Sequence, residues 1–506
     1  MPVSRQECSG ERTKRRLIER FDDGDGALDW TLDPLRQGVE VFMEKAIQWN
    51  QQVDVLVVGS GFAGLTAAIE AGESGKNVVV IEKMKSAGGN SIISDGGIAA
   101  ADTNLQEKWG IEDSQQMMYD DMLKAGLGLN DPKLLHTVVS NARSAFEWTI
   151  DVLNVPYLDR VDIFGGHSVA RCYTPEGVTG RTILKEMLEK IRQLGIPILY
   201  STSFRSIITD EQGHVIGGAV LKQYDYKADT GIPANIRTQR GIILASGGYG
   251  ADVDFRSIQD PRLDGKIQTT NRPCATAEVL KSALNIGARS VQLEQIQLGA
   301  WSSPDEHGFG DGPRFADYIL FQYGVIVDPH TGKRFVNELG DRKQLADAIL
   351  QIGHPCIGIA ENNAVKHSGW DISKAIRKGV VKTFDSMDDL GAVYGINPKA
   401  LRASIDRYNG FVRKGIDDDF QKPIADEACP IEKTPFYAMR LWPKVHYTMG
   451  GLSINERAQV LDLRGNTIDG LYAAGEVVGG VHGASRLGSC ASTECIVFGR
   501  IAGQNI

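Results

Sequence analysis

The sequence predicts an α/β protein in which a smaller α+β domain interrupts a domain built on a parallel sheet. Three observations support this fold class. The apolar run at 53–58 leads directly into a glycine-rich turn, as a strand covered on both faces of a parallel sheet does. A second glycine-rich block of the same kind lies near the C-terminus, at 470–503. Because a long segment separates the two blocks, we infer that this segment is an insertion into a single domain.

The domain boundaries follow from this arrangement. Near the N-terminus, Leu35, Val39, Phe42 and Ala46 recur at a mostly helical spacing. We expect a helix there that packs on the main body, with a regulatory or partner-binding segment as the alternative. The expected division is an N-terminal helical extension, the first part of a dinucleotide-binding domain, a clamp, and the second part of the dinucleotide-binding domain, at 1–49, 50–293, 294–447 and 448–506.

Composition places the chain among ordinary globular proteins and excludes several classes of function. Of its 506 residues 42% are hydrophobic and 24% charged, and the formal net charge is −9 with scattered basic residues, so we expect no nucleic-acid surface. No apolar run approaches the roughly 18 residues of a membrane span, and the N-terminus lacks the apolar core of a secretory signal. The seven cysteines include no CxxC or CxxCH spacing. We therefore expect a cytoplasmic protein with reduced thiols, no fused haem, no metal site and no membrane span.

The first nucleotide-binding element begins with the strand at 53–58. It is followed by a G-x-G-x-x-G turn and then by a helical pattern. Gly59 permits the tight turn, Gly61 lets the backbone approach a pyrophosphate, and Gly64 lets helix and strand pack closely. The pyrophosphate then lies at the N-terminus of the helix, where free N–H groups favour an anion. A second predicted strand ends at Glu82, which is placed to accept a hydrogen bond from a ribose hydroxyl. The pattern predicts a Rossmann-type domain.

Glycine-rich loops beyond Glu82 favour FAD over NAD as the dinucleotide. The stretch at 88–97 contains two glycine pairs, and a flavin ring needs backbone amides of this kind near its N5 and its pyrimidine edge. A later predicted strand at 242–248 ends in small residues, and the C-terminal block brings Glu476 to the ribityl chain. The candidate cofactor-binding residues are Gly59, Gly61, Phe62, Ala63, Gly64, Glu82, Lys83, Gly88, Gly89, Asn90, Ser91, Gly96, Gly97, Ser246, Gly247, Gly248, Asn271, Gly475, Glu476, Arg486, Leu487, Gly488, Cys490 and Ala491.

These blocks resemble the soluble fumarate reductase and flavocytochrome c flavoprotein family over nearly the whole chain from Val53 onward. Relatives in that family include urocanate reductase, acrylate- and cinnamate-type reductases, and ketosteroid dehydrogenases. The resemblance implies a mobile clamp, with the substrate between clamp and flavin. It also implies non-covalent FAD, because the flavinylating histidine of membrane-bound relatives has no counterpart at 90–97. The other matching stretches are 165–171, 269–271, 332–338 and 446–451.

The resemblance also implies catalytic roles. Arg342 matches the arginine that protonates the substrate carbon, and Arg486 matches the arginine that clamps a substrate carboxylate. A guanidinium suits the second role because it binds both oxygens at once and stays charged. Tyr447 is expected to help Arg486, and Tyr318 is expected to help reprotonate Arg342. His446, at the start of the matching stretch 446–451, completes the candidate set.

Departures from the family pattern point to the substrate. The family's Thr-Glu-x-x-Arg falls on 317–321, where Tyr318 and Phe321 replace the polar pair, and an expected histidine is Gly299. One carboxylate site is therefore kept and the other is lost. We expect reduction of a monocarboxylic enoate of the urocanate, cinnamate or acrylate type, by hydride transfer from flavin N5, rather than reduction of fumarate. Trp301 and Phe321 are either apolar walls for the substrate or ordinary core residues.

Two other functions remain open. A ketosteroid- or carboxylate-type dehydrogenase would introduce a C=C bond, with Tyr318 or Tyr447 as acid or base. Retention of Arg342 and Arg486 argues against a steroid, which has no carboxylate to bind. A non-catalytic FAD-binding electron carrier is the third possibility. For an enzyme, the expected partners are a small-molecule substrate and an external electron donor or acceptor, which is a reductase protein, reduced flavin or an NADH system.

Overall fold

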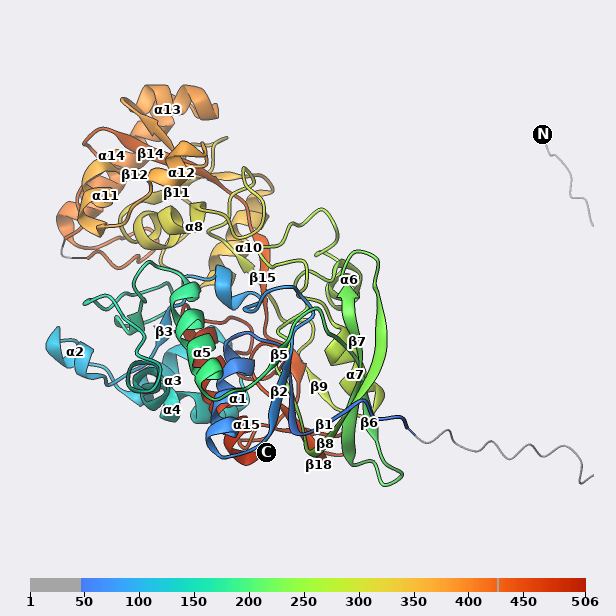
Figure 1. Cartoon of the computed structure of the whole chain (residues 1–506). Helices are drawn as coiled ribbons and strands as arrows, with labels where there is room; N and C mark the ends of the chain where they lie inside the picture. The colour runs from blue at the N-terminus through green and yellow to red at the C-terminus, as the bar shows by residue number, and fades with distance from the viewer. Residues whose placement is uncertain (1–46, 426) are drawn as a thin grey trace, which may run out of the picture. The chain divides into compact units, whose positions relative to one another are not determined.

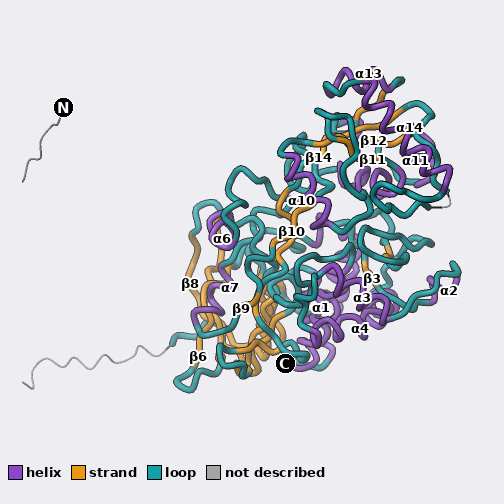
Figure 2. The backbone as a smooth tube through the Cα atoms, turned by 180° about the vertical axis from the view of Figure 1, so that it is seen from behind, coloured by secondary structure: helices purple, strands orange, loops and turns teal. Residues whose placement is uncertain are grey.

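The described residues of the computed structural model, 47–425 and 427–506, include an eight-stranded mixed sheet (Figures 1 and 2). The helix predicted between Leu35 and Ala46 lies outside the described residues. The strand order is β17-β18-β8-β1-β2-β5, and β7 and β6 extend from β8. The strands are β1 (Gln51–Val58), β2 (Val78–Ile81), β5 (Ile198–Leu199), β6 (Ser203–Thr209), β7 (Val215–Asp225), β8 (Thr230–Leu244), β17 (Gln459–Leu461) and β18 (Thr467–Ala473).

The centre of this sheet is parallel, as its apolar strands predict. Strand β1 pairs in parallel with β2 on one side and with β8 on the other. Val58 lies opposite both Ile81 and Leu244, so these three strands end at one edge of the sheet. Strand β18 adds to β8 in parallel, which brings Ala473 from the C-terminal block to the same edge. The two distant glycine-rich blocks therefore meet in one domain.

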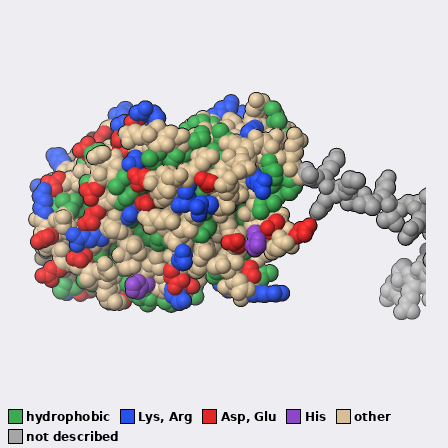
Figure 3. Space-filling model, turned by 60° about the horizontal axis from the view of Figure 1, so that its bottom comes forward, with side chains coloured by type: hydrophobic (Ala, Val, Ile, Leu, Met, Phe, Trp, Pro, Cys, Tyr) green, Lys and Arg blue, Asp and Glu red, His purple; other side chains and the backbone are tan. Residues whose placement is uncertain are grey.

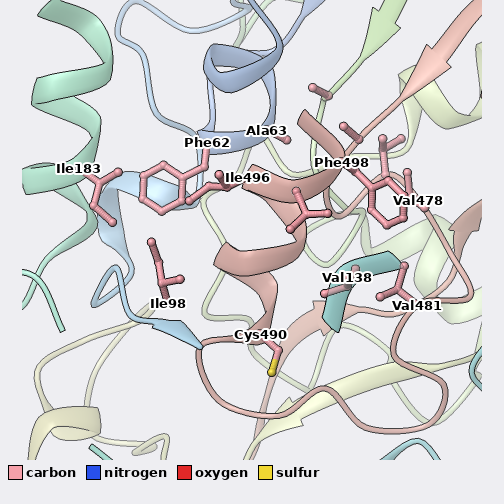
Figure 4. Close-up of a cluster of buried hydrophobic side chains, with 14 of the residues drawn as sticks. Phe62, Ala63, Ile98, Val138, Ile183, Val478, Val481, Cys490, Ile496 and Phe498 are labelled. Atoms are coloured by element: carbon pink, nitrogen blue, oxygen red, sulfur yellow. The ribbon is translucent and has the colours of Figure 1, made fainter. Parts of the chain in front are cut away.

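Helices α1 (Phe62–Glu73) and α15 (Cys490–Asn505) pack against each other beside this sheet. Small residues let them approach closely: a Cβ on Gly503 would lie 2.4 Å from the carbonyl oxygen of Ala67. Figure 4 shows Phe62 between Ile183 and Ile496 in the buried cluster that joins α1, α5 and α15. Further helices of this region are α2 (Asn104–Lys108), α3 (Gln115–Ala125), α4 (Pro132–Asp151), α5 (Gly180–Gln193), α6 (Val253–Gln259) and α7 (Glu278–Asn285).

The inserted segment contains a four-stranded antiparallel sheet with the order β11-β12-β14-β13. Figure 1 shows β11, β12 and β14 grouped with α11 to α14. A separate buried cluster that includes Val325, Ile357 and Tyr408 fills the space under this sheet. The elements are α8 (Gly312–Phe315), α9 (Phe321–Tyr323), β11 (Val325–Val327), α10 (Arg342–Ile352), β12 (Cys356–Glu361), α11 (Asn362–Ser368), α12 (Ser373–Arg377), β13 (Lys382–Phe384), α13 (Met387–Tyr394), α14 (Pro398–Lys414) and β14 (Phe436–Leu441).

Two short strands carry the chain into and out of this segment. Strand β10 (Ile296–Gly299) pairs antiparallel with β15 (Lys444–Thr448). The ends of the segment therefore lie side by side, which is the arrangement expected of an insertion. The remaining short pairs are β3 (Ile98–Ala99) with β4 (Cys172–Tyr173) and β9 (Ser290–Val291) with β16 (Gly451–Leu452).

Charges of both signs cover the surface. Figure 3 shows one face on which basic and acidic side chains are interspersed rather than gathered by sign. Among the described residues, no helix is both long enough and apolar enough to cross a membrane.

Candidate active site

A first cavity lies at the edge where β1, β2 and β8 end, and the predicted dinucleotide residues line it. Gly59 and Gly61 come from the turn between β1 and α1, and Glu82 follows β2 directly. The Glu82 carboxylate accepts a hydrogen bond from the Met84 N–H at 2.9 Å and others from the backbone and hydroxyl of Ser60. These bonds fix the carboxylate at the cavity wall, where a ribose hydroxyl can reach it.

The space around the glycines of the β1–α1 turn indicates whether a dinucleotide can bind there. A Cβ on Gly64 would lie 2.0 Å from the carbonyl oxygen of Gly59, so this position serves close packing of strand and helix. Gly61 lines the cavity, and the nearest atom to a Cβ there is Ser91 Oγ, at 3.2 Å. The space above Gly61 is therefore cavity rather than protein. Helix α1 begins at this turn, so its N-terminus lies at the cavity, with the Phe62 N–H donating to Ser91 Oγ at 3.1 Å. A helix N-terminus beside an open space fits a pyrophosphate.

A second cavity continues from the first, since Phe62, Asn90, Ser91, Glu476 and Cys495 line both. The predicted cofactor residues that line one or both cavities are Gly59, Gly61, Phe62, Ala63, Glu82, Lys83, Gly89, Asn90, Ser91, Ser246, Gly247, Asn271, Glu476, Arg486 and Ala491. The predicted residues that line neither cavity are Gly64, Gly88, Gly96, Gly97, Gly248, Gly475, Leu487, Gly488 and Cys490. Lys83 pairs with Glu278 at 3.2 Å, a contact between distant segments that the motifs alone do not indicate.

Glu476 stands at the junction of the two cavities. Its Oε1 accepts hydrogen bonds from the Thr448 N–H at 3.0 Å and from the Thr448 hydroxyl at 3.3 Å. Burial raises the pKa of this carboxyl to about 7, so it holds a proton for much of the neutral range. A protonated carboxyl at this position can donate a hydrogen bond as well as accept one, which suits a polyol chain.

Arg486 lines the second cavity and is almost fully buried. Its Cζ lies 4.7 Å from the centre of the Tyr447 ring. Burial, together with the charge of Arg342, lowers the pKa of Arg486 to about 10, which still leaves it charged at neutral pH. Among the described residues, its buried Nε has no hydrogen-bond partner. The Arg486 Nη1 donates to the Leu487 carbonyl at 3.3 Å. Because a buried cationic donor without a partner is costly, the free Nε makes Arg486 a candidate for binding an anion in the cavity.

The Tyr447 hydroxyl points to a different partner than the sequence suggested. It donates to Glu494 Oε2 at 2.8 Å, and the same oxygen lies 2.8 Å from His482 Nε2. The hydroxyl is therefore engaged inside the protein, and the ring face of Tyr447 supports Arg486. Burial raises the pKa of Tyr447 well above its usual value, so it stays protonated.

Arg342 is the first residue of α10 and lies close to an unpredicted carboxylate. Its Nη2 is 3.6 Å from Asp317 Oδ2, and its Cζ lies 5.7 Å from the centre of the Trp301 ring. The Nη1 atom is buried and has no hydrogen-bond partner within 47–425 and 427–506. Burial raises the pKa of Asp317 to about 7, although Arg342 opposes this shift. Near neutral pH, the Asp317 carboxyl beside Arg342 can therefore be either ionised or protonated.

Tyr318 reaches a second aspartate rather than Arg342. Its hydroxyl donates to Asp95 Oδ2 at 3.2 Å, and burial raises the pKa of Asp95 to about 6. Asp317 and Tyr318 lie in a π-helical turn over Ala316–Leu320, a local irregularity that often occurs at functional sites. Asp95 precedes the predicted glycine pair at 96–97, for which the sequence indicated only backbone contacts. Two acids with pKa values near neutrality therefore lie around Arg342.

Aromatic groups form the rest of the second cavity. His446 lines it, and its Nδ1 lies 2.8 Å from the Thr270 hydroxyl. Burial and the two nearby arginines lower the pKa of His446 well below its usual value, so the imidazole is neutral. Phe309, which carried no sequence signal, lines the same cavity. Trp301 and Phe321 are buried core residues that do not line it.

The parallel sheet, the dinucleotide cavity and the adjoining cavity with a buried arginine define the chain as a dinucleotide-dependent oxidoreductase. The family model described as "FAD binding domain" matches residues 54–492. The chain is 40% identical to the acrylate reductase flavoprotein subunit of Shewanella woodyi, over 90% of this chain and 92% of that protein. It is 34% identical to urocanate reductase of Eggerthella lenta, over 90% and 77% of the two chains.

A solved structure of the open conformation of a flavocytochrome c3 fumarate reductase is similar as well. It superposes with a TM-score of 0.71 at 31% identity, covering 90% of this chain and 78% of the other. The chain belongs to the FAD binding domain family and, within it, to the soluble fumarate reductase and flavocytochrome c flavoproteins. It is an FAD-dependent oxidoreductase that acts on CH–CH groups, as the sequence predicted.

Proposed function

We propose that this enzyme reduces the C=C bond of an α,β-unsaturated monocarboxylate of the acrylate, cinnamate or urocanate type. The observation that carries this proposal is Arg486, which lines the second cavity and whose buried Nε has no hydrogen-bond partner among the described residues. Arg486 faces that cavity beside Phe309 and Ile93, whereas the other arginine, Arg342, is paired with Asp317. One carboxylate thus finds a cation, and the remaining wall suits an apolar group.

FAD, held without a covalent bond, would rest on Gly59, Gly61 and Glu82 in the first cavity and reach past Asn90 into the second. When bound, it supplies two-electron chemistry at a C–C bond. The relatives named as acrylate and urocanate reductases support the reductive direction.

Arg486 binds and orients the substrate. A guanidinium with a free Nε can hold both oxygens of a carboxylate, and the Tyr447 ring beneath it keeps the guanidinium in place. Charge that develops on the carboxylate during reduction is stabilised by the same cation. A second carboxylate, as in fumarate, would lie near the Arg342–Asp317 pair, whose acidic member repels it once ionised.

Arg342 delivers the proton that completes the reduction. It donates from its guanidinium to the substrate carbon, and the Asp317 carboxyl, 3.6 Å from Nη2, returns a proton to it. An arginine alone is a poor acid because its pKa exceeds about 12. Asp317 matches the task better, since its pKa of about 7 lets it both hold and release a proton at neutral pH. Asp95, which accepts a hydrogen bond from the Tyr318 hydroxyl, is a second carboxyl from which Asp317 could be reprotonated.

A stopped-flow experiment tests the proposed substrate class. The flavin is reduced without oxygen and mixed with equal concentrations of acrylate, cinnamate, urocanate and fumarate. We expect at least one monocarboxylate to reoxidise the flavin faster than fumarate does. Faster reaction with fumarate would refute the assignment of the cavity. Reaction with a 3-ketosteroid alone would move the assignment to the dehydrogenase alternative.

The electron partner and the cellular location stay predictions. We propose that electrons reach the flavin from an external reductase protein, from reduced flavin or from an NADH system. The cytoplasmic location expected from the sequence is likewise untested by the fold.

A further inference from the structure

Three potential metal ligands lie together in the clamp, away from both cavities. Asp328 directly follows β11, His330 belongs to the turn after it, and His354 follows the end of α10. One ligand atom of each side chain lies within 4.8 Å of the others. His354 Nε2 is 3.4 Å from Asp328 Oδ1, and the two imidazole centres are 3.9 Å apart.

We propose that Asp328, His330 and His354 bind one divalent transition-metal ion of the zinc type. Two imidazole nitrogens and one carboxylate oxygen form a donor set that suits zinc and its neighbours rather than magnesium or calcium, which prefer oxygen ligands. Ligands on one tetrahedral zinc ion lie roughly 3.3 Å apart, given Zn–N bonds of about 2.0–2.1 Å. The Asp328–His354 distance already has this value.

The backbone holds two of the three ligands in place before any metal arrives. The Asp328 carboxylate accepts hydrogen bonds from the His330 N–H at 2.9 Å and from the Thr331 hydroxyl at 2.8 Å. Each carboxylate oxygen keeps a further lone pair for a metal. Gly353 ends α10 with a φ of 85°, which turns the chain so that His354 faces Asp328. His330 is exposed, so its side chain is free to close the site.

An ordinary ion pair explains only part of this arrangement. One histidine beside Asp328 would suffice for a hydrogen bond, and the chain has such a pair elsewhere, His214 with Asp210 at 3.2 Å. The second imidazole distinguishes the clamp cluster. At this distance both imidazoles place a ring nitrogen near one carboxylate, and a single cation would join the three groups.

A bound metal would fasten α10 at the end opposite to Arg342. The 11-residue helix spans about 16 Å, so the metal is too far away to touch the substrate. It would tie the end of α10 to the turn after β11 and so stabilise the clamp. This site could not be predicted from the sequence, because His330 and His354 are separated by an entire helix.

Equilibrium dialysis of the chelator-treated holoenzyme against Zn²⁺, with metal counted by atomic emission, tests the proposal. We expect wild type to bind one zinc ion per chain more than His330→Ala or His354→Ala, with an affinity at this site lowered about tenfold or more in each variant. His214→Ala is the matched control, because it removes a histidine from a similar turn and a similar pair with aspartate. It should bind as much zinc as wild type.

Thermal unfolding gives a second measurement on the same proteins. Zn²⁺ should raise the unfolding temperature of wild type and of His214→Ala, but not of His330→Ala. Since His330 is exposed, its variant should keep the FAD content and metal-free unfolding temperature of wild type. Equal zinc uptake by wild type and His330→Ala would overturn the proposal, as would equal loss in His214→Ala.

Discussion

At Arg486, one substitution can test whether binding of a substrate carboxylate needs the shape of the guanidinium or only its positive charge. Lysine at this position keeps the positive charge but cannot hold both oxygens of a carboxylate. Loss of such a charge-assisted pair costs roughly 1.5–3 kcal/mol, so Arg486→Lys should weaken enoate binding about ten- to 150-fold. Steady-state KM values and substrate titrations of the oxidised enzyme measure this change. The control is Arg440→Lys, which alters an exposed ion pair with Asp305 and should leave KM unchanged.

In the proposed mechanism, the protonation of Asp317 makes the reaction depend on pH. Its pKa is raised to about 7, so the fraction of protonated carboxyl falls as the pH rises above 7, and turnover of wild type should fall with it. Asp317→Asn should lose roughly a hundredfold in kcat and should not show this decline. Asp305→Asn removes a similar but exposed carboxylate and should behave like wild type. A variant with the wild-type pH profile would contradict the role of Asp317.

The same residue links pH to stability. A carboxyl whose pKa is higher in the folded protein than in the unfolded chain holds its proton more tightly when folded. Its contribution is therefore lost as the pH rises from about 4 to about 7, by a few kcal/mol for an isolated group. Asp317→Asn cannot ionise, so it should unfold at a higher temperature than wild type at pH 8, with a smaller difference at pH 5.

Some of the candidate site residues could be predicted from the sequence and others could not. Arg342 and Arg486 were identifiable because each lies in a recognisable motif. Asp95 and Asp317 were not, because they come together only in three dimensions, one from a loop and one from a π-helical turn. Tyr447 was found but its contact was not, since the direction of a hydroxyl depends on Glu494 across the fold.

At the scale of elements, the turn between β1 and α1 carries the strongest prediction. A valine at Gly61 would place its side chain in the cavity where the pyrophosphate is proposed to bind, so Gly61→Val should abolish FAD binding. The flavin absorbance per purified chain measures this loss. Gly410→Val is the control, because Gly410 is exposed on α14 and a Cβ there meets no described atom within 4 Å. Full flavin occupancy in Gly61→Val would place the cofactor elsewhere.

Element boundaries were predictable where the pattern was strong. The strand expected at 53–58 is observed over Gln51–Val58, and the second strand over Val78–Ile81. The helix expected from the sequence over 65–74 is observed over Phe62–Glu73, because the glycine turn itself supplies its first residues. Strand β8 is far longer than the apolar run at 242–244 indicated. Its polar first half is held by pairing with β7, which local sequence does not reveal.

At the scale of the whole molecule, the topology assembles the FAD cavity from distant parts of the chain. The cavity walls come from the β1–α1 turn, the end of β8 and the C-terminal block, which are distant in sequence but adjacent in the sheet. The pairing of β10 with β15 holds the two ends of the inserted segment together, so the parts of the chain before and after it can join one sheet. The sequence predicted this interruption from two similar blocks, although it could not predict which clamp residues reach Arg486.

Bound FAD should therefore stabilise the entire fold. A ligand that binds only the folded chain adds about 2.7 kcal/mol at a free concentration 100 times its Kd, so FAD should raise the unfolding temperature of the flavin-free protein. Riboflavin, which lacks the pyrophosphate and adenosine, should have a smaller effect at the same concentration. In Gly61→Val the shift with FAD should disappear.

Acid precipitation of the holoenzyme should leave the FAD in solution, because the cavity is proposed to hold it without a covalent bond to the protein. A yellow pellet that keeps its flavin after repeated washing would contradict that mode of binding.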